Sequence, residues 1–145
     1  MSPRNMAEVF LDTNVAVDLV TMRQPFYNEA VFIERLAQAG SINMIVSEGS
    51  IVTMIYIAFH KYKLPNAEDR LVSFLESCRV TSSTYSLILA ALRSTFRDKE
   101  DAYQYQTALK CHADYFVTRD KKDFKSVIPY HLPVITPPQL EYMLF

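Results

Sequence analysis

Short apolar runs alternate with longer segments of helical periodicity along the whole chain. Residues 9–11, 42–46 and 115–117 form compact, mostly apolar runs that each stop at a polar residue. Such runs are typical of buried strands, whereas the segments between them space their apolar residues three and four apart, as amphipathic helices do. Buried strands that alternate with helices predict an α/β fold with a mainly parallel sheet.

The remaining elements follow from the same periodicity and from capping residues. Gly40 stands where a helix C-terminal glycine would, and Ser47 is a good N-cap for the segment after it. Pro137 and Pro138 lead into a short C-terminal helix. The predicted helices cover residues 13–20, 27–39, 48–61, 66–76, 85–95 and 99–112, and two further strands cover 79–81 and 132–135.

Length and composition narrow the class of protein. The 145 residues, half of them apolar, predict a single domain over 1–145 and exclude a disordered chain. Apolar runs long enough to span a membrane and the apolar core of a signal peptide are missing from the sequence, so we expect a cytosolic protein without membrane contact. Two glycines, Gly40 and Gly49, exclude a P-loop and a dinucleotide-binding fingerprint.

Carboxylates stand at predicted strand ends. Asp12 directly follows the first strand, and Asp120 comes three residues after the strand 115–117. Asp98 and Asp101 begin the helix 99–112, and their spacing puts them on one face. In open α/β sheets the working crevice lies beyond the carboxyl ends of the strands, so these acids are expected to meet there.

Acids gathered in a crevice need a positive partner, because they repel one another and lose hydration. The residues beside Asp12 in the sequence include no lysine or arginine. A hard divalent cation, Mg²⁺ or Mn²⁺, is the economical partner, because these ions prefer carboxylate oxygen and water. Such an ion suits phosphodiester hydrolysis, since it polarises a phosphoryl oxygen and lowers the pKa of a bound water.

Each acid also has a structural interpretation. Asp98 is most simply a helix N-cap, Asp101 could complete a capping pair with it, and Asp12 could cap the helix that follows. Asp120 and Asp123 lie in a charged run that is typical of a solvated loop. Taken singly, therefore, these residues leave both interpretations open.

Three ordered segments carry a resemblance to a known family. They read VFLDTN at residues 9–14, DKEDA at 98–102 and VTRDKKDF at 117–124, and the likeness extends over nearly the whole chain. In this wording and order the sequence resembles PIN domains, a family that consists largely of metal-dependent ribonucleases and includes VapC-like toxins of toxin–antitoxin modules. The resemblance implies a three-layer α/β/α sandwich with a central, mainly parallel sheet.

The resemblance assigns roles to the acids at the first strand and at the later helix. Asp12 matches the first metal-binding acid, and Asn14 matches the small polar residue that orients it. Asp101 matches the acid at the start of the later helix, and Asp98 a more peripheral acidic position. These matches imply that Asp12 and Asp101 are metal ligands and catalytic residues.

The last matching segment supplies the final acid and its neighbours. Asp120 and Asp123 both fall in the region of the final metal-binding acid, and the sequence does not decide which of them faces the metal. Thr118 and Arg119 match the strand-end pair that leads into the site. Thr118 is accordingly expected to support the ligands.

One position departs from the family pattern. PIN nucleases usually carry a glutamate six residues after the serine that Ser47 matches, and here that position holds Thr53. Threonine brings no charge, and Glu48, five residues earlier, lies on another face of the helix. Three carboxylates remain to bind one metal ion, with Thr53 as a neutral neighbour.

Basic residues surround the final acids. Lys121, Lys122 and Lys125, together with Arg119, are expected to meet substrate phosphates. Residues 93–125 carry eight basic and six acidic side chains, although the whole chain has a net charge of −1. This balance is compatible with a small basic rim around an acidic site and excludes a long basic nucleic-acid-binding face.

Two functions from different classes follow. The first is a Mg²⁺- or Mn²⁺-dependent endoribonuclease in which a metal-activated water attacks the phosphodiester; the resemblance further implies a homodimer and, for a toxin, a cognate antitoxin. The second is a weakly active or inactive RNA-binding or antitoxin-binding module, because Thr53 replaces the glutamate. A haloacid-dehalogenase-type phosphatase is disfavoured, since it needs an aspartate where Asn14 stands.

Overall fold

The computed structural model describes residues 6–125 and 131–145. Its strands are β1 (Ala7–Leu11), β2 (Ile42–Ser47), β3 (Cys78–Thr81), β4 (Tyr115–Val117) and β5 (Val134–Ile135). Its α-helices are α1 (Thr13–Thr21), α2 (Phe26–Gln38), α3 (Glu48–Tyr56), α4 (Ala67–Glu76), α5 (Tyr85–Arg93), α6 (Lys99–Lys110) and α7 (Pro137–Leu144). A π-helical turn, η2 (Ile57–Lys61), extends α3, and a 3₁₀ turn, η3 (Lys121–Phe124), follows β4.

The five strands form one parallel sheet in the order β3-β2-β1-β4-β5. From β1 the chain builds the sheet outward through β2 and β3, and then returns to the other side of β1 for β4 and β5. The order of the strands therefore reverses between β1 and β4. In open parallel sheets such a switch point opens a crevice at the carboxyl ends of the two strands.

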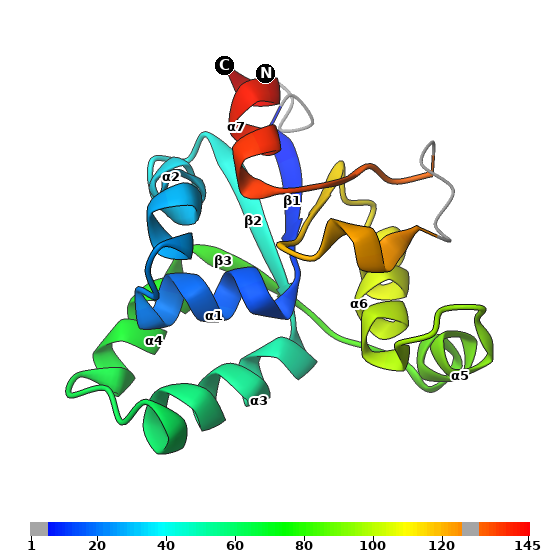
Figure 1. Ribbon diagram of the computed structural model, residues 1–145, viewed down its shortest axis with the longest axis horizontal. Helices are drawn as coiled ribbons and strands as arrows, with labels where there is room; N and C mark the ends of the chain where they lie inside the picture. The colour runs from blue at the N-terminus through cyan, green and yellow to red at the C-terminus, as the bar shows by residue number, and fades with distance from the viewer. Residues whose placement is uncertain (1–5, 126–130) are drawn as a thin grey trace.

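Helices cover both faces of the sheet (Figure 1). Alternate residues of β1 point to opposite faces, so Val9 and Leu11 belong to one apolar core and Phe10 to another. The first core includes residues of α1, α2, α4 and α7, and the second includes residues of α5 and α6. In the second core Phe10 stacks on Phe116 of β4 with ring centroids 5.5 Å apart. The predicted three-layer α/β/α sandwich is confirmed.

The predicted elements agree with the structure except near their ends. Gly40 adopts a φ of +76° just after Ala39, the C-cap of α2, as expected of a glycine that ends a helix. The strand predicted over 132–135 is reduced to Val134–Ile135, because Leu132 is buried in the second core and its carbonyl accepts a hydrogen bond from Tyr105. The charged run after Arg119, read as a loop, contains η3, which forms because Phe124 is buried.

Within the described residues, the structure holds no helix that is both long and apolar enough to cross a membrane.

Candidate active site

Asp12 lies at the switch point of the sheet. It follows β1 directly, and its backbone N–H donates to the Val117 carbonyl of β4 at 2.9 Å. Its extended backbone conformation also makes it the N-cap of α1. The structural and functional interpretations of Asp12 are thus compatible, because one side chain lies both at the N-terminus of α1 and at the carboxyl end of β1.

The Asp12 carboxylate is buried and held by two neutral donors. Oδ1 accepts from the Thr13 N–H at 2.8 Å, and Oδ2 accepts from the Thr118 hydroxyl at 2.8 Å. Burial nevertheless raises the pKa of Asp12 to about 6, and the nearby charges of Glu100 and Asp120 add to the rise. The site therefore carries an acid whose negative charge lacks sufficient compensation from its neighbours.

A chain of hydrogen bonds ties Asp120 to Asp12. Asn14 donates to Asp120 Oδ2 at 3.2 Å and to the Thr118 hydroxyl at 3.3 Å, and Thr118 in turn donates to Asp12. The Asp120 N–H donates to Thr118 Oγ1 at 3.1 Å, and the Arg119 N–H donates to Asn14 Oδ1 at 3.3 Å. Asn14 and Thr118 thus fix the segment after β4 relative to Asp12.

The first turn of α6 brings the other acids to the same edge. Asp98 is the N-cap, and its Oδ1 accepts from the N–H groups of Glu100 and Asp101. The half-buried Asp101 is different, because desolvation, followed by the charges of Asp12, Asp98 and other acids, raises its pKa to about 7. After desolvation, the charge of Asp12 is the largest cause of this rise, so the Asp101 carboxylate faces the same region as that of Asp12.

Asp120 and Asp123 approach this region from different sides. Asp120 adds to the pKa rise of Asp12, whereas Asp123 adds to that of Asp101. Both side chains are exposed on the segment that contains η3. Glu100 affects both buried acids and was not among the predicted site residues. Its position between Asp98 and Asp101 in the first turn was the available signal.

A buried polar network behind Asp12 was also missed by the sequence analysis. Gln104 Nε2 donates to the hydroxyls of Thr13 at 2.8 Å and Ser50 at 2.9 Å, and Gln104 Oε1 accepts from Ser47 at 3.2 Å. The network joins α6 to α1, the end of β2 and the start of α3. Gln104 lies three residues after Asp101 on the same face of α6, so the network fixes the helix that carries Asp101.

Thr53 lies on α3 where the family pattern has a glutamate. Its hydroxyl contacts the Gly49 carbonyl one turn earlier at 3.4 Å. This local bond is typical of a threonine within a helix and brings no charge toward Asp12.

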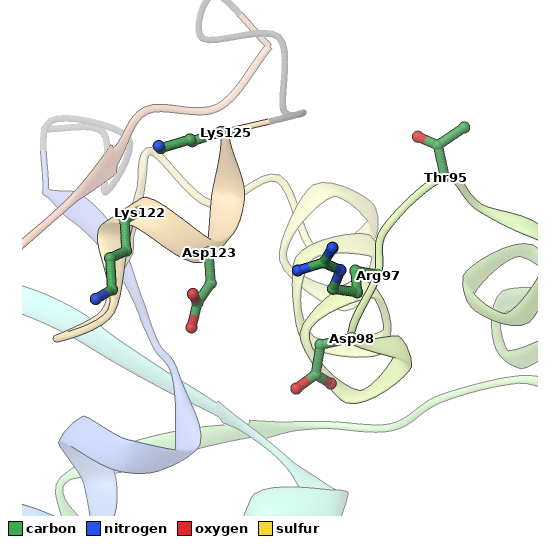
Figure 2. A pocket seen from close by; sticks show the side chains of 6 residues that line it. All are labelled: Thr95, Arg97, Asp98, Lys122, Asp123 and Lys125. Carbon is green, nitrogen blue, oxygen red and sulfur yellow. The ribbon is translucent and has the colours of Figure 1, made fainter.

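The four predicted phosphate-binding residues divide into two pairs. Arg119 Nε forms a 2.6 Å ion pair with the buried Asp18, and its guanidinium lies 3.9 Å from the centre of the Phe26 ring. Lys121 Nζ contacts Gln139 Oε1 of α7 at 3.2 Å. Lys122 and Lys125 instead border a cavity together with Asp98 and Asp123, shown in Figure 2.

The sequence model of the PIN domain family matches residues 8–122 of this chain. This chain belongs to the PIN domain family. The match runs from β1 to the start of η3, and it includes every acid of the site except Asp123. No curated protein sequence matched this PIN domain.

Two solved structures share the PIN fold of this chain. The first is VapBC2 from Rickettsia felis bound to a DNA fragment from its promoter, with 18% identity and a TM-score of 0.63. That similarity covers 88% of this chain and 97% of the other. The second is VapC20 from Mycobacterium tuberculosis, a toxin that cleaves the sarcin–ricin loop, with 16% identity and a TM-score of 0.57. This similarity covers 74% of the present chain and 86% of VapC20.

The acids of this PIN domain suit a divalent cation in their chemistry. No set of three or more His, Cys, Asp and Glu side chains within residues 6–125 and 131–145 is close enough to hold a metal ion as it stands. Asp12 and Asp101 nevertheless supply hard carboxylate oxygens, and within the described chain no lysine or arginine forms an ion pair with either. Burial and the repulsion of neighbouring acids raise both pKa values, and a cation between the two carboxylates would offset these effects.

Proposed function

We propose that this PIN domain is a Mg²⁺- or Mn²⁺-dependent endoribonuclease and acts as the toxin of a toxin–antitoxin module. The proposal rests on one observation. Asp12 and Asp101 face the same region at the switch point of the sheet, and the pKa of each lies well above that of a free carboxyl group. Acids held in this unfavourable way are typical of functional sites. Electrostatic strain of this kind favours a divalent cation as the missing component.

Each acid of the site has a role in this proposal. Asp12 and Asp101, with Asp120 or Asp123, would hold the ion, which when bound would polarise a phosphoryl oxygen and lower the pKa of a water. Thr118 and Asn14 keep Asp12 and Asp120 in place through the hydrogen bonds described above. The Gln104 network keeps α6, and hence Asp101, at a fixed position relative to α1.

The proposed partners are RNA, an antitoxin protein and a second copy of the chain. One structural neighbour is VapBC2 bound to promoter DNA, and the other is VapC20, a toxin that cleaves the sarcin–ricin loop. The helix formed by α3 and η2 exposes apolar side chains on one face, namely Val52, Ile55, Tyr56 and Phe59. A row of exposed apolar residues of this kind is typical of a protein-binding surface.

Cleavage of structured and unstructured RNA in Mn²⁺ tests the enzymatic part. Asp12→Asn and Asp101→Asn are each expected to lower the rate by about 100-fold or more, because each removes a ligand at the reacting centre. Asp69→Asn is the matched control, since it removes the same charge from an exposed position on α4. Equal rates in all four proteins would contradict the proposal and indicate a contaminating nuclease.

Thr53 favours a second candidate, a weakly active or inactive PIN fold that binds RNA or an antitoxin. The neutral hydroxyl, bonded to its own helix, leaves the metal with fewer acidic ligands than the family pattern has. Thr53→Glu is expected to increase Mn²⁺-dependent cleavage if the missing carboxylate limits the enzyme. Thr53→Gln, of nearly the same size without the charge, is the control. A wild type that binds RNA but does not cleave it would favour this second candidate.

A further inference from the structure

A cavity of about 550 Å³ adjoins the acidic site on the α6 side. It lies between η3 and the connection from α5 to α6, and Figure 2 shows Arg97 and Asp123 extending into the same gap. Its volume is within the range of small-ligand sites in proteins. The described residues that line it are Thr95, Arg97, Asp98, Lys122, Asp123 and Lys125.

The cavity carries more positive than negative charge. Arg97, Lys122 and Lys125 supply three cations, against the two carboxylates of Asp98 and Asp123. These five side chains form no ion pair with one another. Asp98 is already engaged as the N-cap of α6, because its Oδ1 accepts two backbone N–H groups. The free donors in the cavity therefore exceed its free acceptors, which favours an anion.

The position of the cavity connects it to the site. Asp98 begins the helix that carries Asp101, and Asp123 belongs to η3, which follows Asp120. Asp98 lines the cavity and caps the first turn of α6, which carries Asp101, so the cavity lies next to that turn. A polyanion that passes Asp101 would extend directly into the cavity.

We propose that this cavity binds a backbone phosphate of the RNA strand beside the cleaved bond, with Arg97 as its principal phosphate-binding residue. Arg97 presents a planar set of N–H donors that matches phosphate oxygens, and Lys122 and Lys125 add charge from the opposite wall. The inference rests on the proposed ribonuclease function. It assigns the phosphate to Lys122 and Lys125 rather than to Lys121 and Arg119, which contact Gln139 and Asp18.

The test compares how the full-length wild type, Arg97→Gln and Arg93→Gln bind and cleave a short single-stranded RNA. Arg93 is the matched control, because it is an exposed arginine at the end of α5 that does not line the cavity. Binding is measured in Ca²⁺, and KM and kcat in Mn²⁺, each over a range of salt concentrations. Arg97→Lys is included because it keeps the charge but not the planar donor set.

Arg97→Gln is expected to weaken binding and raise KM by about threefold to tenfold, with kcat nearly unchanged. The slope of log affinity against log salt should decrease by about 0.7, the value for one lost phosphate contact on a single strand. Arg93→Gln should leave both quantities unchanged, and Arg97→Lys should restore the slope but only part of the affinity.

Other outcomes overturn the proposal in distinguishable ways. A wild type that cleaves RNA, with equal slopes and KM values for Arg97→Gln and Arg93→Gln, rejects the phosphate site and leaves the ribonuclease function intact. A wild type that neither binds nor cleaves RNA rejects both. If Arg97→Gln instead binds Mn²⁺ more tightly, with no change in its salt dependence for RNA, the cavity serves a cation and the proposal is wrong.

Discussion

Glu34 and Asp12 are both buried acids, yet the fold surrounds them with opposite chemistry. Glu34 on α2 accepts from Arg70 of α4 through both carboxylate oxygens, at 3.0 and 2.8 Å, and Arg70 also donates to the Leu19 carbonyl. Asp12 accepts from two neutral groups, and burial raises its pKa. Where an acid joins helices the chain supplies a cation, and where an acid faces the end of the sheet it does not. The second arrangement leaves a place for an external cation.

Asp18 shows an intermediate arrangement on α1. Its Oδ2 forms the ion pair with Arg119, while its Oδ1 is buried without a hydrogen-bond partner among the described residues. Burial raises the pKa of Asp18 even though the arginine opposes the change. The pair fixes Arg119 against Phe26 and so holds the start of the segment that carries Asp120. The main contribution of Asp18 is therefore to hold Arg119 in position.

The largest expected change in stability comes from breaking the ion pair between Glu34 and Arg70. Arg70→Met should lower the free energy of unfolding by about 3 kcal/mol, because it leaves Glu34 buried without its cation. Urea unfolding followed by circular dichroism measures this loss. Arg79→Met is the control, since its ion pair with Glu8 is more exposed and should be worth less than about 1 kcal/mol. Equal losses in the two variants would mean that burial does not distinguish these pairs.

The fold could be predicted from the sequence because its strands are short, apolar and end at polar residues. The pair of Glu34 and Arg70 could not, since the two residues are 36 positions apart and meet only where α2 and α4 pack together. Asp18 offered a weak signal, as the one charged residue in the helix predicted over 13–20. Its partner Arg119 is 101 residues away and was assigned to substrate instead.

For the site, too, local features of the sequence could be predicted and contacts between distant segments could not. Asp12, Asp98 and Asp101 could be located because a strand end or a helix start fixes the place of each one locally. Gln104 could not be recognised, because its role depends on three hydroxyl groups from other segments. Which of two neighbouring acids approaches Asp12 also depended on the turn in η3, which forms around the buried Phe124.

A smaller change in stability is expected when a divalent cation binds to the acids around Asp12 and Asp101. Mg²⁺ or Mn²⁺ at ten times its dissociation constant should stabilise the wild type by about 1.4 kcal/mol at pH 8, because it binds only the folded acids. Thermal unfolding with and without the ion measures the shift. Asp101→Asn should lose most of it, whereas Asp69→Asn should keep it. An ion that stabilises all three proteins equally would act elsewhere on the molecule.

The smallest effect is the pH dependence of the metal-free protein. The pKa of Asp101 is raised from 3.8 to about 7, so the folded state binds more protons than the unfolded state between these values. The contribution of Asp101 to stability is therefore most favourable at low pH and declines as the pH rises from about 4 to about 7. Since the side chain is only half-buried, solvent screening reduces the effect.

Asp101→Asn removes this titration and should unfold about 2 °C above the wild type at pH 8 in EDTA, with the difference vanishing near pH 4. Asp69→Asn should follow the wild-type curve, because Asp69 is exposed on α4 and does not belong to the site. Melting temperatures measured from pH 4 to pH 8 provide the comparison. If the wild type instead gained stability relative to Asp101→Asn as the pH rises through this window, Asp101 would have a cationic partner. The contrast with Glu34 would then disappear, because both acids would be paired.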